Sequence, residues 1–312
     1  MFVKRLFIVG ILFLSACFIT GSYFDHKYRK AWSTLFFSAT DTILAKDKNY
    51  DIILLGDSRI HFGLNPYYID SVTGLSSYNF AIGGSDAAML KLNSTLYLQQ
   101  HPAPKFVVIG AGNSMIKAPL SVKSQFHFLY YLKEDAVYDQ LKKYYPGLLL
   151  VKYLPFLKYA YFDEYNRRSV FARPIKYERF EHNIYKGFIN THQFENTRGK
   201  IDFGIDTSNR PIDSLGINMI KEVITGFTKA GSQVILVSPP FKEDVQANTK
   251  PLSRVTDSVF LKLAEECKVP FIKSDDPIYT DDKFIDERHL NEPGSRIFSR
   301  KIGEYIRHYS LK

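Results

Sequence analysis

Tyr50-Asp-Ile-Ile-Leu-Leu-Gly-Asp-Ser-Arg59 is a short apolar run that stops at a glycine and continues into polar residues. The run is rich in residues that favour strands, and the glycine marks the point where the strand ends. Ser58 is therefore expected where a buried strand turns into a helix. Open α/β sheets build their sites at the carboxyl ends of strands, so this serine occupies a position suited to chemistry.

Further strand and helix candidates alternate along the chain. Strands are predicted at residues 51 to 55, 77 to 81, 105 to 109, 233 to 238 and 269 to 273, and helices at 86 to 100, 215 to 229, 252 to 267 and from 291 onward. Nearly continuous apolar strands separated by helices are typical of a parallel sheet that is covered on both faces. The sequence therefore predicts an α/β fold.

A second polar motif, Asp286-Glu-Arg-His289, lies near the end of the sequence. On one helical turn or in a tight loop its first and last side chains can face the same way. A serine hydroxyl needs a nearby histidine to take its proton and a third group to orient the imidazole. Ser58, His289 and Asp286 are predicted to supply these parts. His289 directly precedes the last helix, so we expect its position to be rigid.

Two glycine-containing segments follow the second and third predicted strands, at residues 77–86 and 105–114. Acyl transfer develops negative charge on a carbonyl oxygen, and hydrogen-bond donors aimed at that oxygen are usually the largest catalytic contribution. The backbone N–H groups of Ser58 and Gly84, together with the side-chain amide of Asn113, would form such an oxyanion hole.

With these motifs in this order, the chain resembles the SGNH hydrolases, the GDSL-type esterase superfamily. The matching blocks are Gly56-Asp57-Ser58, Asn79 to Gly84, Gly112-Asn113, and Asp286 with His289. The resemblance covers roughly residues 49 to 114 and 216 to 310. It implies a three-layer fold around a flavodoxin-like parallel sheet. It also implies that Ser58 is the nucleophile, His289 the general base and Asp286 its partner, with Ser58, Gly84 and Asn113 as oxyanion donors.

Two residues depart from the common pattern of that superfamily. Arg59 stands where many members have leucine, and Ser114 follows Asn113 where many have aspartate. Neither departure replaces a residue that is expected to be catalytic. Arg59 either pairs with an anionic group of the substrate or with Asp57, and the sequence leaves both options open. The chain looks more like the membrane-anchored SGNH proteins that work with or on bacterial cell-envelope glycans than like the secreted esterases.

The N-terminus carries a membrane signal. Residues 6 to 24 hold no charge and follow Lys4 and Arg5, and this length is about what is needed to cross the hydrocarbon core. A retained signal anchor over residues 1–24 is favoured, with the amino end in the cytoplasm and a stem at residues 25–48. Leu14-Ser-Ala-Cys17 also resembles a lipoprotein processing box, in which Cys17 would carry the lipid, and a cleaved secretory peptide is the third alternative.

All three alternatives put the main domain, residues 49–312, outside the cytoplasm. The expected location is the bacterial inner membrane, with the domain facing the periplasm or the cell surface. Cys267 is the single thiol beyond the N-terminal segment, so no disulfide is expected within the domain.

Residues 116–212 break the alternation of strands and helices and are expected to form a large, mainly helical insertion. Between Ser121 and Lys200 there are 14 Lys and Arg against 8 Asp and Glu, together with 19 Phe and Tyr. The insertion is either a lid or platform whose aromatic faces stack on sugars, or a subdomain whose aromatic residues are its own core. The second alternative is favoured, because aromatic residues are ordinary core material. A basic face that meets anionic lipid is a third alternative.

The same charge gives little reason to expect nucleic-acid binding. No recognised nucleic-acid-binding module accompanies the basic residues, and the domain is expected to be extracytoplasmic. The histidines at positions 61, 127, 182 and 192 show no metal-ligand spacing with Cys, Asp or Glu, so neither a metal nor another cofactor is predicted.

These features together predict a membrane-tethered serine esterase or O-acyltransferase of the SGNH type. Its expected substrates are ester groups, including O-acetyl groups, on cell-envelope glycans. Water as acceptor would make the protein an esterase, and a bound sugar hydroxyl would make it a transferase. The alternative is a non-catalytic protein that keeps the fold to bind an acylated glycan or to dock on a membrane acyltransferase partner.

Overall fold

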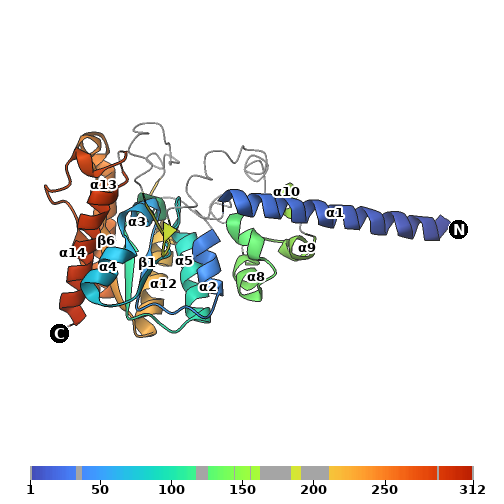
Figure 1. The fold of residues 1–312 in the computed structure, drawn as a ribbon, viewed down its shortest axis with the longest axis horizontal. Helices are drawn as coiled ribbons and strands as arrows, with labels where there is room; N and C mark the ends of the chain where they lie inside the picture. The colour runs from blue at the N-terminus through green and yellow to red at the C-terminus, as the bar shows by residue number, and fades with distance from the viewer. Residues whose placement is uncertain are drawn as a thin grey trace. The chain divides into compact units, whose positions relative to one another are not determined.

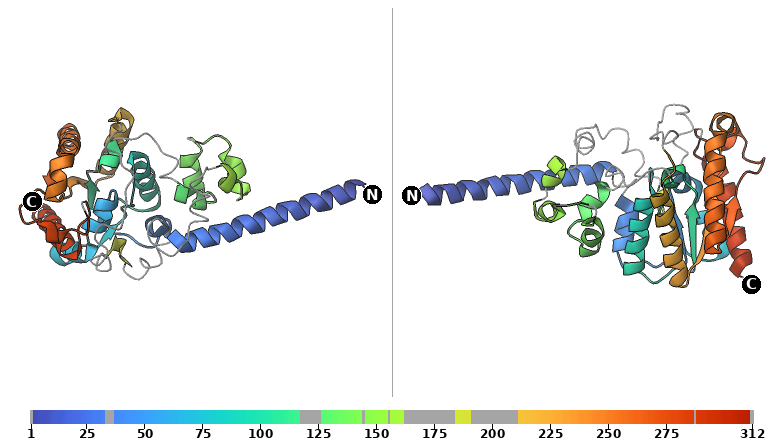
Figure 2. Two further views of the ribbon diagram at one scale, coloured as in Figure 1. Left: turned by 90° about the horizontal axis from the view of Figure 1, so that it is seen from above. Right: turned by 180° about the vertical axis from the view of Figure 1, so that it is seen from behind.

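The computed structural model describes residues 2–32, 37–116, 126–143, 145–154, 156–161, 184–190, 211–286 and 288–310. The chain divides into two compact units. The smaller unit combines residues 1–37 with 122–181, and the larger unit combines residues 38–121 with 182–312. Figures 1 and 2 draw the helices and strands of both units.

The larger unit is built on a five-stranded parallel sheet with the order β2-β1-β3-β6-β7. The strands are β1 (Ile52–Leu55), β2 (Ser77–Asn79), β3 (Phe106–Gly110), β6 (Gln233–Ser238) and β7 (Phe271–Lys273). Every predicted strand is present, and the predicted parallel sheet is confirmed. In chain order the strands run second, first, third, fourth, fifth, which is the order of flavodoxin-like sheets.

Helices cover both faces of this sheet, as Figure 1 shows. On one face are α2 (Ser38–Leu44), α5 (Ala87–Gln100), α12 (Ser214–Lys229) and α13 (Glu243–Cys267). On the other are α3 (Ser58–Gly63), α4 (Pro66–Thr73) and α14 (Glu292–Ser310). Helix α5 packs against α2 and α12, and α14 packs against α3 and α4. The mixed α/β architecture with helices on both faces therefore agrees with the sequence.

The core under α14 explains why this last helix is anchored. The sheet side chains of Ile52, Leu54 and Val108 lie in one buried cluster with Phe298 and Ile302 of the helix. Alternate side chains of a strand point to opposite faces, so this set belongs to the face that α4 and α14 cover. Burial of each such side chain contributes about 1.5–3 kcal/mol. The C-terminal helix is thus held rigidly against the strands.

A hairpin that the sequence did not predict joins the larger unit. Strands β4 (Ile184–Tyr185) and β5 (Phe188–Ile189) pair antiparallel, and they fall within the range 116–212 that the sequence assigns to an insertion. The carbonyl of Lys186 accepts a hydrogen bond from the N–H of Asn79 at 2.9 Å. The Lys186 ammonium also reaches the Asp70 carboxylate of α4. The hairpin is therefore bonded to the end of β2.

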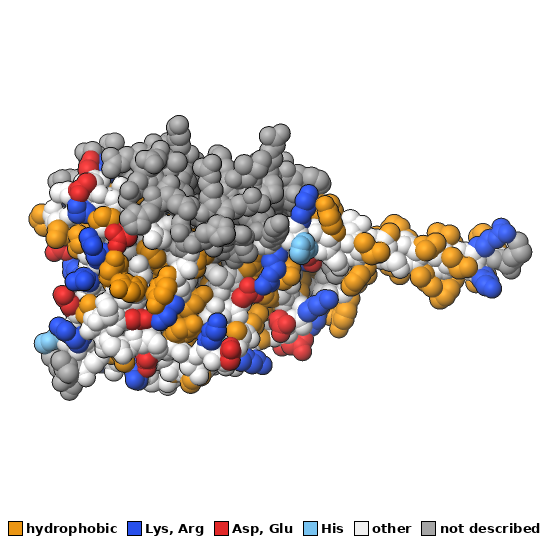
Figure 3. Space-filling model, in the orientation of Figure 1, with side chains coloured by type: hydrophobic (Ala, Val, Ile, Leu, Met, Phe, Trp, Pro, Cys, Tyr) orange, Lys and Arg blue, Asp and Glu red, His pale blue; other side chains and the backbone are white. Residues whose placement is uncertain are grey.

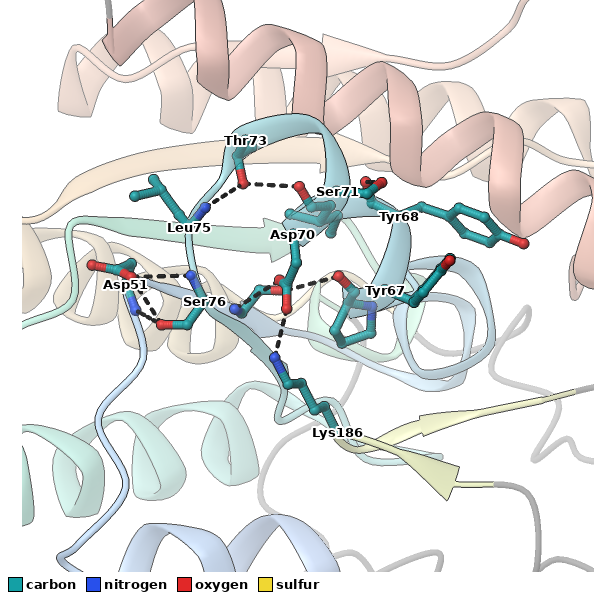
Figure 4. Close-up of polar contacts among 12 residues, drawn as sticks. Asp51, Tyr67, Tyr68, Asp70, Ser71, Thr73, Leu75, Ser76 and Lys186 are labelled. Atoms are coloured by element: carbon teal, nitrogen blue, oxygen red, sulfur yellow. Dashed lines mark hydrogen bonds and ion pairs between the residues drawn. The ribbon is translucent and has the colours of Figure 1, made fainter.

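Figure 4 shows how this carboxylate ties three segments together. One Asp70 oxygen accepts the N–H of Ser77 at 2.8 Å and also its hydroxyl, while the other faces Lys186. Nearby, Asp51 accepts the N–H of Ser76 at 3.0 Å. Both aspartates thus hold the start of β2, one from α4 and one from the residue before β1.

The smaller unit contains one long helix and a group of short ones. Helix α1 runs over Phe2–Trp32, and the short helices are η2 (Phe126–Tyr131), α8 (Asp135–Leu141), α9 (Leu148–Tyr153) and α10 (Leu157–Tyr161). Among the described residues α1 is the one helix long and apolar enough to cross a membrane. Figure 3 shows hydrophobic side chains along it and basic ones near its start. In the short helices Phe128 and Tyr131 are buried core residues, whereas Tyr153 is exposed.

Replacing Gly187 with alanine should destabilise the larger unit. Gly187 has a φ of +78°, and a Cβ atom there would lie 2.0 Å from the carbonyl oxygen of Asn79. The left-handed conformation alone costs alanine about 1–2 kcal/mol, and the displaced hairpin should add about 1–3 kcal/mol. Denaturant titrations of the full chain in detergent would measure the loss in free energy of unfolding.

Gly74→Ala is the matched control for this substitution. Its φ of +71° is similar, but a Cβ atom there would meet nothing within 4 Å. We expect this variant to lose the conformational contribution alone. An equal loss in the two variants would contradict close packing of the hairpin on β2.

Candidate active site

The nucleophile candidate lies where β1 turns into α3. Asp57 caps this helix, and its carboxylate accepts the backbone N–H of Arg59 at 3.0 Å. Ser58 is the first residue of the helix, so its own N–H has no partner in the preceding turn. The amide of Asn79 donates to the carbonyls of Ile60 and Leu64 at 2.9 and 2.8 Å, which fixes the far end of the helix. Hydrogen bonds at both ends of α3 therefore hold Ser58 in place.

The structure brings Ser58, His289 and Asp286 into one hydrogen-bonded chain. The Oγ atom of Ser58 lies 2.8 Å from Nε2 of His289, and Nδ1 of the same ring lies 2.7 Å from an Asp286 oxygen. An ionised carboxylate can only accept, so Nδ1 carries the proton and Nε2 is left to accept the serine hydroxyl. The predicted contacts are present, in the geometry that a nucleophile, a base and an orienting group require.

The loop around Asp286 keeps its carboxylate ionised and aimed at the ring. Burial alone would raise the pKa of Asp286, but hydrogen bonds from His289 and from the N–H groups of Arg288 and His289 lower it overall. Both backbone bonds measure 2.8 Å. The N–H of Ile285 also donates to the carbonyl of His289 at 2.9 Å, which closes the loop.

The imidazole is buried as well as bonded. His289 is 5% exposed, and its ring packs edge-on against Phe62 of α3 with centroids 5.2 Å apart. Two residues further on, the side chain of Asn291 accepts the N–H of Gly294 at 3.1 Å at the start of α14. Asn291 therefore caps α14, and the histidine has little freedom to leave the serine.

The glycine turn after β2 lies beside the serine. A Cβ atom on Gly83 would be 3.9 Å from Cβ of Ser58, whereas one on Gly84 would meet nothing within 4 Å. Gly84 is exposed and has a φ of +72°. The N–H of Ile82 bonds the carbonyl of Gly56 at 3.0 Å, which joins this turn to the turn that carries the serine. Gly83 is thus the glycine nearer to the side chain of Ser58. At Gly84 the position that a Cβ atom would take is free of neighbouring atoms.

Asn113 follows β3, the neighbour of β1, and begins the short helix α6 (Asn113–Ile116). Its side-chain oxygen accepts a hydrogen bond from the hydroxyl of Thr256, a buried residue of α13. An amide whose oxygen is engaged in this way keeps its NH₂ group for other partners. No local sequence pattern pointed to this threonine, because it lies inside a helix 143 residues further along the chain.

Arg59 forms no ion pair with Asp57 in the described structure, and the option of an anionic substrate group stays a prediction. Among the described residues, its guanidinium donates to the carbonyl of Ala111 at 3.3 Å and to that of Pro239, and it lies 3.7 Å from the ring centre of Phe241. Its Nε atom is buried without a hydrogen-bond partner. Burial lowers the pKa of Arg59 to about 10, although Asp57 raises it. The side chain thus links the strand ends of β1, β3 and β6 beneath the site.

His61 lies on the same short helix as Ser58 but is not part of the hydrogen-bonded chain of Ser58, His289 and Asp286. It is 2% exposed, and burial lowers its pKa to about 4 despite a backbone hydrogen bond with Gly187. Charge on His289 lowers it further. Within the described part of the chain, no group of three His, Cys, Asp or Glu side chains is placed to hold a metal ion.

His61 should make the fold less stable in mild acid. Its folded-state pKa lies below the unfolded value of about 6.5, so the unfolded chain takes up a proton first as the pH falls. Between pH 6.5 and pH 5 this costs about 2 kcal/mol of unfolding free energy. His61→Gln should lose about that much less over the same interval, measured by denaturant titration at both pH values. His308→Gln, at an exposed position, should behave like the unchanged protein, and an identical loss in all three proteins would contradict a neutral buried His61.

Comparison with known proteins adds no relative to this picture. No model of a protein family matches the chain, and no curated protein matches it.

Proposed function

We propose that this protein is a membrane-tethered serine esterase or O-acyltransferase of the SGNH type. The observation that carries the proposal is the hydrogen-bonded chain from Ser58 through His289 to Asp286. A buried imidazole held by an ionised carboxylate and in contact with a serine hydroxyl is the arrangement that activates serine as a nucleophile.

In the first step Ser58 Oγ attacks the carbonyl carbon of an ester. Its proton passes to Nε2 of His289, and Asp286 stabilises the imidazolium that results. When the tetrahedral intermediate collapses, the same Nε2 returns the proton to the leaving alcohol oxygen. The acyl group is then bonded to Ser58, and the alcohol, which is the deacylated part of the substrate, departs.

Donors around the serine would hold the negative charge of the intermediate. The N–H of Ser58 stands at the first position of α3, where helix geometry leaves it unpaired within the helix. We assign the other two donor positions to the N–H of Gly84 and the side chain of Asn113. The engagement of the Asn113 oxygen by Thr256 supports this role, because it reserves the NH₂ group for an acceptor.

The second step decides between hydrolysis and transfer. A water molecule that loses its proton to His289 and attacks the acyl-serine releases a carboxylic acid, which is an esterase reaction. A sugar hydroxyl that does the same takes the acyl group, which is a transferase reaction. Both use the same residues, so the proposal includes both.

The N-terminal helix and the resemblance support the proposed substrate class and location. Helix α1 is long and apolar enough for a single span. We propose that it anchors the protein in a bacterial inner membrane, with the larger unit on the periplasmic or outer side. Esters of cell-envelope glycans, including O-acetyl esters, are the substrates that such a position favours.

A fluorophosphonate probe should label Ser58 covalently, because these reagents react with activated serine hydroxyls. The test uses the full chain in detergent, with the labelled peptide located by mass spectrometry. Ser58→Ala should abolish labelling. His289→Ala should slow it by at least about 10³-fold, and Asp286→Asn by a comparable factor, through loss of the ring's tautomer.

Ser114→Ala is the matched control, since it removes a neighbouring hydroxyl that bonds the carbonyl of Ser85 at 2.8 Å. It should label at the unchanged rate. A folded protein that shows no labelling would overturn the hydrolase and transferase proposal and leave the non-catalytic alternative.

Thr256 should act as a positioning residue for Asn113. Thr256→Val removes the hydroxyl that holds the amide oxygen and should lower kcat for an aryl acetate about tenfold, with little change in KM. Asn113→Ala should lower kcat about 10²–10³-fold. Thr256→Ser keeps the hydroxyl and should restore most of the activity. A serine variant as slow as the valine variant would contradict this role.

A further inference from the structure

The short helices of the smaller unit are bound to the end of the apolar segment of α1. The Lys158 ammonium forms an ion pair with Asp25 at 2.6 Å, and Asp25 is the first charged residue after that segment. The hydroxyl of Tyr159 bonds the same carboxylate, and its ring lies 5.6 Å from that of Phe24. Lys158 is 9% exposed, so the pair is nearly buried and fixes α10 to this level of the helix.

A second contact reaches further along α1 toward its N-terminus. The ammonium of Lys133 lies 5.9 Å from the ring centre of Phe18. Phe18 precedes Asp25 by seven residues, or about 10 Å along a helix axis. The segment between η2 and α8 therefore overlaps the last turns of the apolar stretch. If α1 spans a bilayer, these helices lie at the boundary between head groups and acyl chains, where a lysine can keep its charge in the polar layer.

Helix α9 exposes large apolar side chains at the same place. Leu149, Leu150 and Tyr153 are 52%, 61% and 67% exposed, while Leu148 and Val151 are buried against the rest of the unit. In Figures 1 and 2, α9 lies on the side of these short helices that is turned toward the N-terminal end of α1. One helix thus has an apolar face for the core and a second apolar face without a protein neighbour in the described structure.

The charges around α9 are largely paired. Lys152 bonds Asp135 at 2.7 Å, and Lys142 bonds Asp139 at 2.6 Å. Attraction of these two lysines to anionic head groups is therefore reduced. The exposed leucines and the tyrosine match the apolar layer just below the head groups, where a tyrosine can keep its hydroxyl in the polar region.

We propose that η2, α8, α9 and α10 form a membrane-interface module that inserts Leu149, Leu150 and Tyr153 into the leaflet through which α1 leaves the bilayer. The partner is the lipid itself. This inference rests on the proposed anchoring by α1 and goes beyond it, because a single-pass anchor needs no second point of insertion. With two points of insertion, the smaller unit is restrained in its depth and tilt relative to the membrane.

Site-directed spin labelling of the full chain tests this directly. Cys17 and Cys267 are replaced by alanine, and one nitroxide is attached through Leu150→Cys in protein reconstituted into neutral phosphatidylcholine vesicles. Relaxation by oxygen, which concentrates in the bilayer, is compared with relaxation by a water-soluble nickel chelate. We expect oxygen to be the stronger relaxant at position 150. Added salt should leave the result unchanged, because apolar insertion carries the contact.

Two further positions serve as references. A label at Phe13→Cys, within the apolar segment of α1, reports the anchor, and a label at Asp139→Cys, on the exposed side of α8, should be reached by the nickel chelate. If position 13 is in lipid but position 150 is in water, the interface proposal fails while the anchor stands. If position 13 is also in water, the anchor itself fails. If position 150 is shielded from both reagents, it contacts protein, which also overturns the proposal.

Discussion

The parallel pairing of β1 with both of its neighbours is the constraint on which the site depends. Because β2 and β3 flank β1 in register, the turns that follow all three strands open at one edge of the sheet. The chain moves outward from β1 in opposite directions, which makes this edge the switch point of the sheet. The sheet therefore brings Ser58, the glycine turn and Asn113 to one edge, and hydrogen bonds between the turns add to this arrangement. The C-terminal loop, which carries His289, is then held over them by α14.

Sequence reasoning succeeded where the residue types alone indicate a secondary structure or a chemical role. Continuous apolar runs predicted the strands, and the serine, histidine and aspartate were found because their chemistry requires those types. It failed where the role of a residue depends on a contact with a residue far away in the chain. The hairpin at Gly187 packs closely on the backbone of Asn79, and Arg59 donates to two backbone carbonyls. The hydroxyl of Thr256 bonds an amide 143 residues away. None of these produces a local pattern, so spacing and periodicity could not reveal them.

The buried guanidinium beneath the site illustrates how such distant contacts shape the chemistry. A charge taken out of water is costly unless it is bonded, and Arg59 recovers only part of this through carbonyls and an aromatic face. The carbonyls it bonds belong to the turns after β3 and β6, next to Asn113 on one side and Phe241 on the other. A leucine at this position could fill the space but could not hold those turns. Arg59 therefore adds rigidity at the strand ends that a leucine would not provide.

Ser58 and His289 are 231 residues apart in the chain, and the loop of His289 leads directly into the last helix. A protein that leaves the ribosome N-terminus first presents Ser58 long before His289 exists. Until α14 has docked on α3 and α4, His289 is not held against the hydroxyl of Ser58. The hydrogen bond between Ser58 and His289 is therefore among the last contacts that this chain can form, and a copy that ends before α14 would lack it.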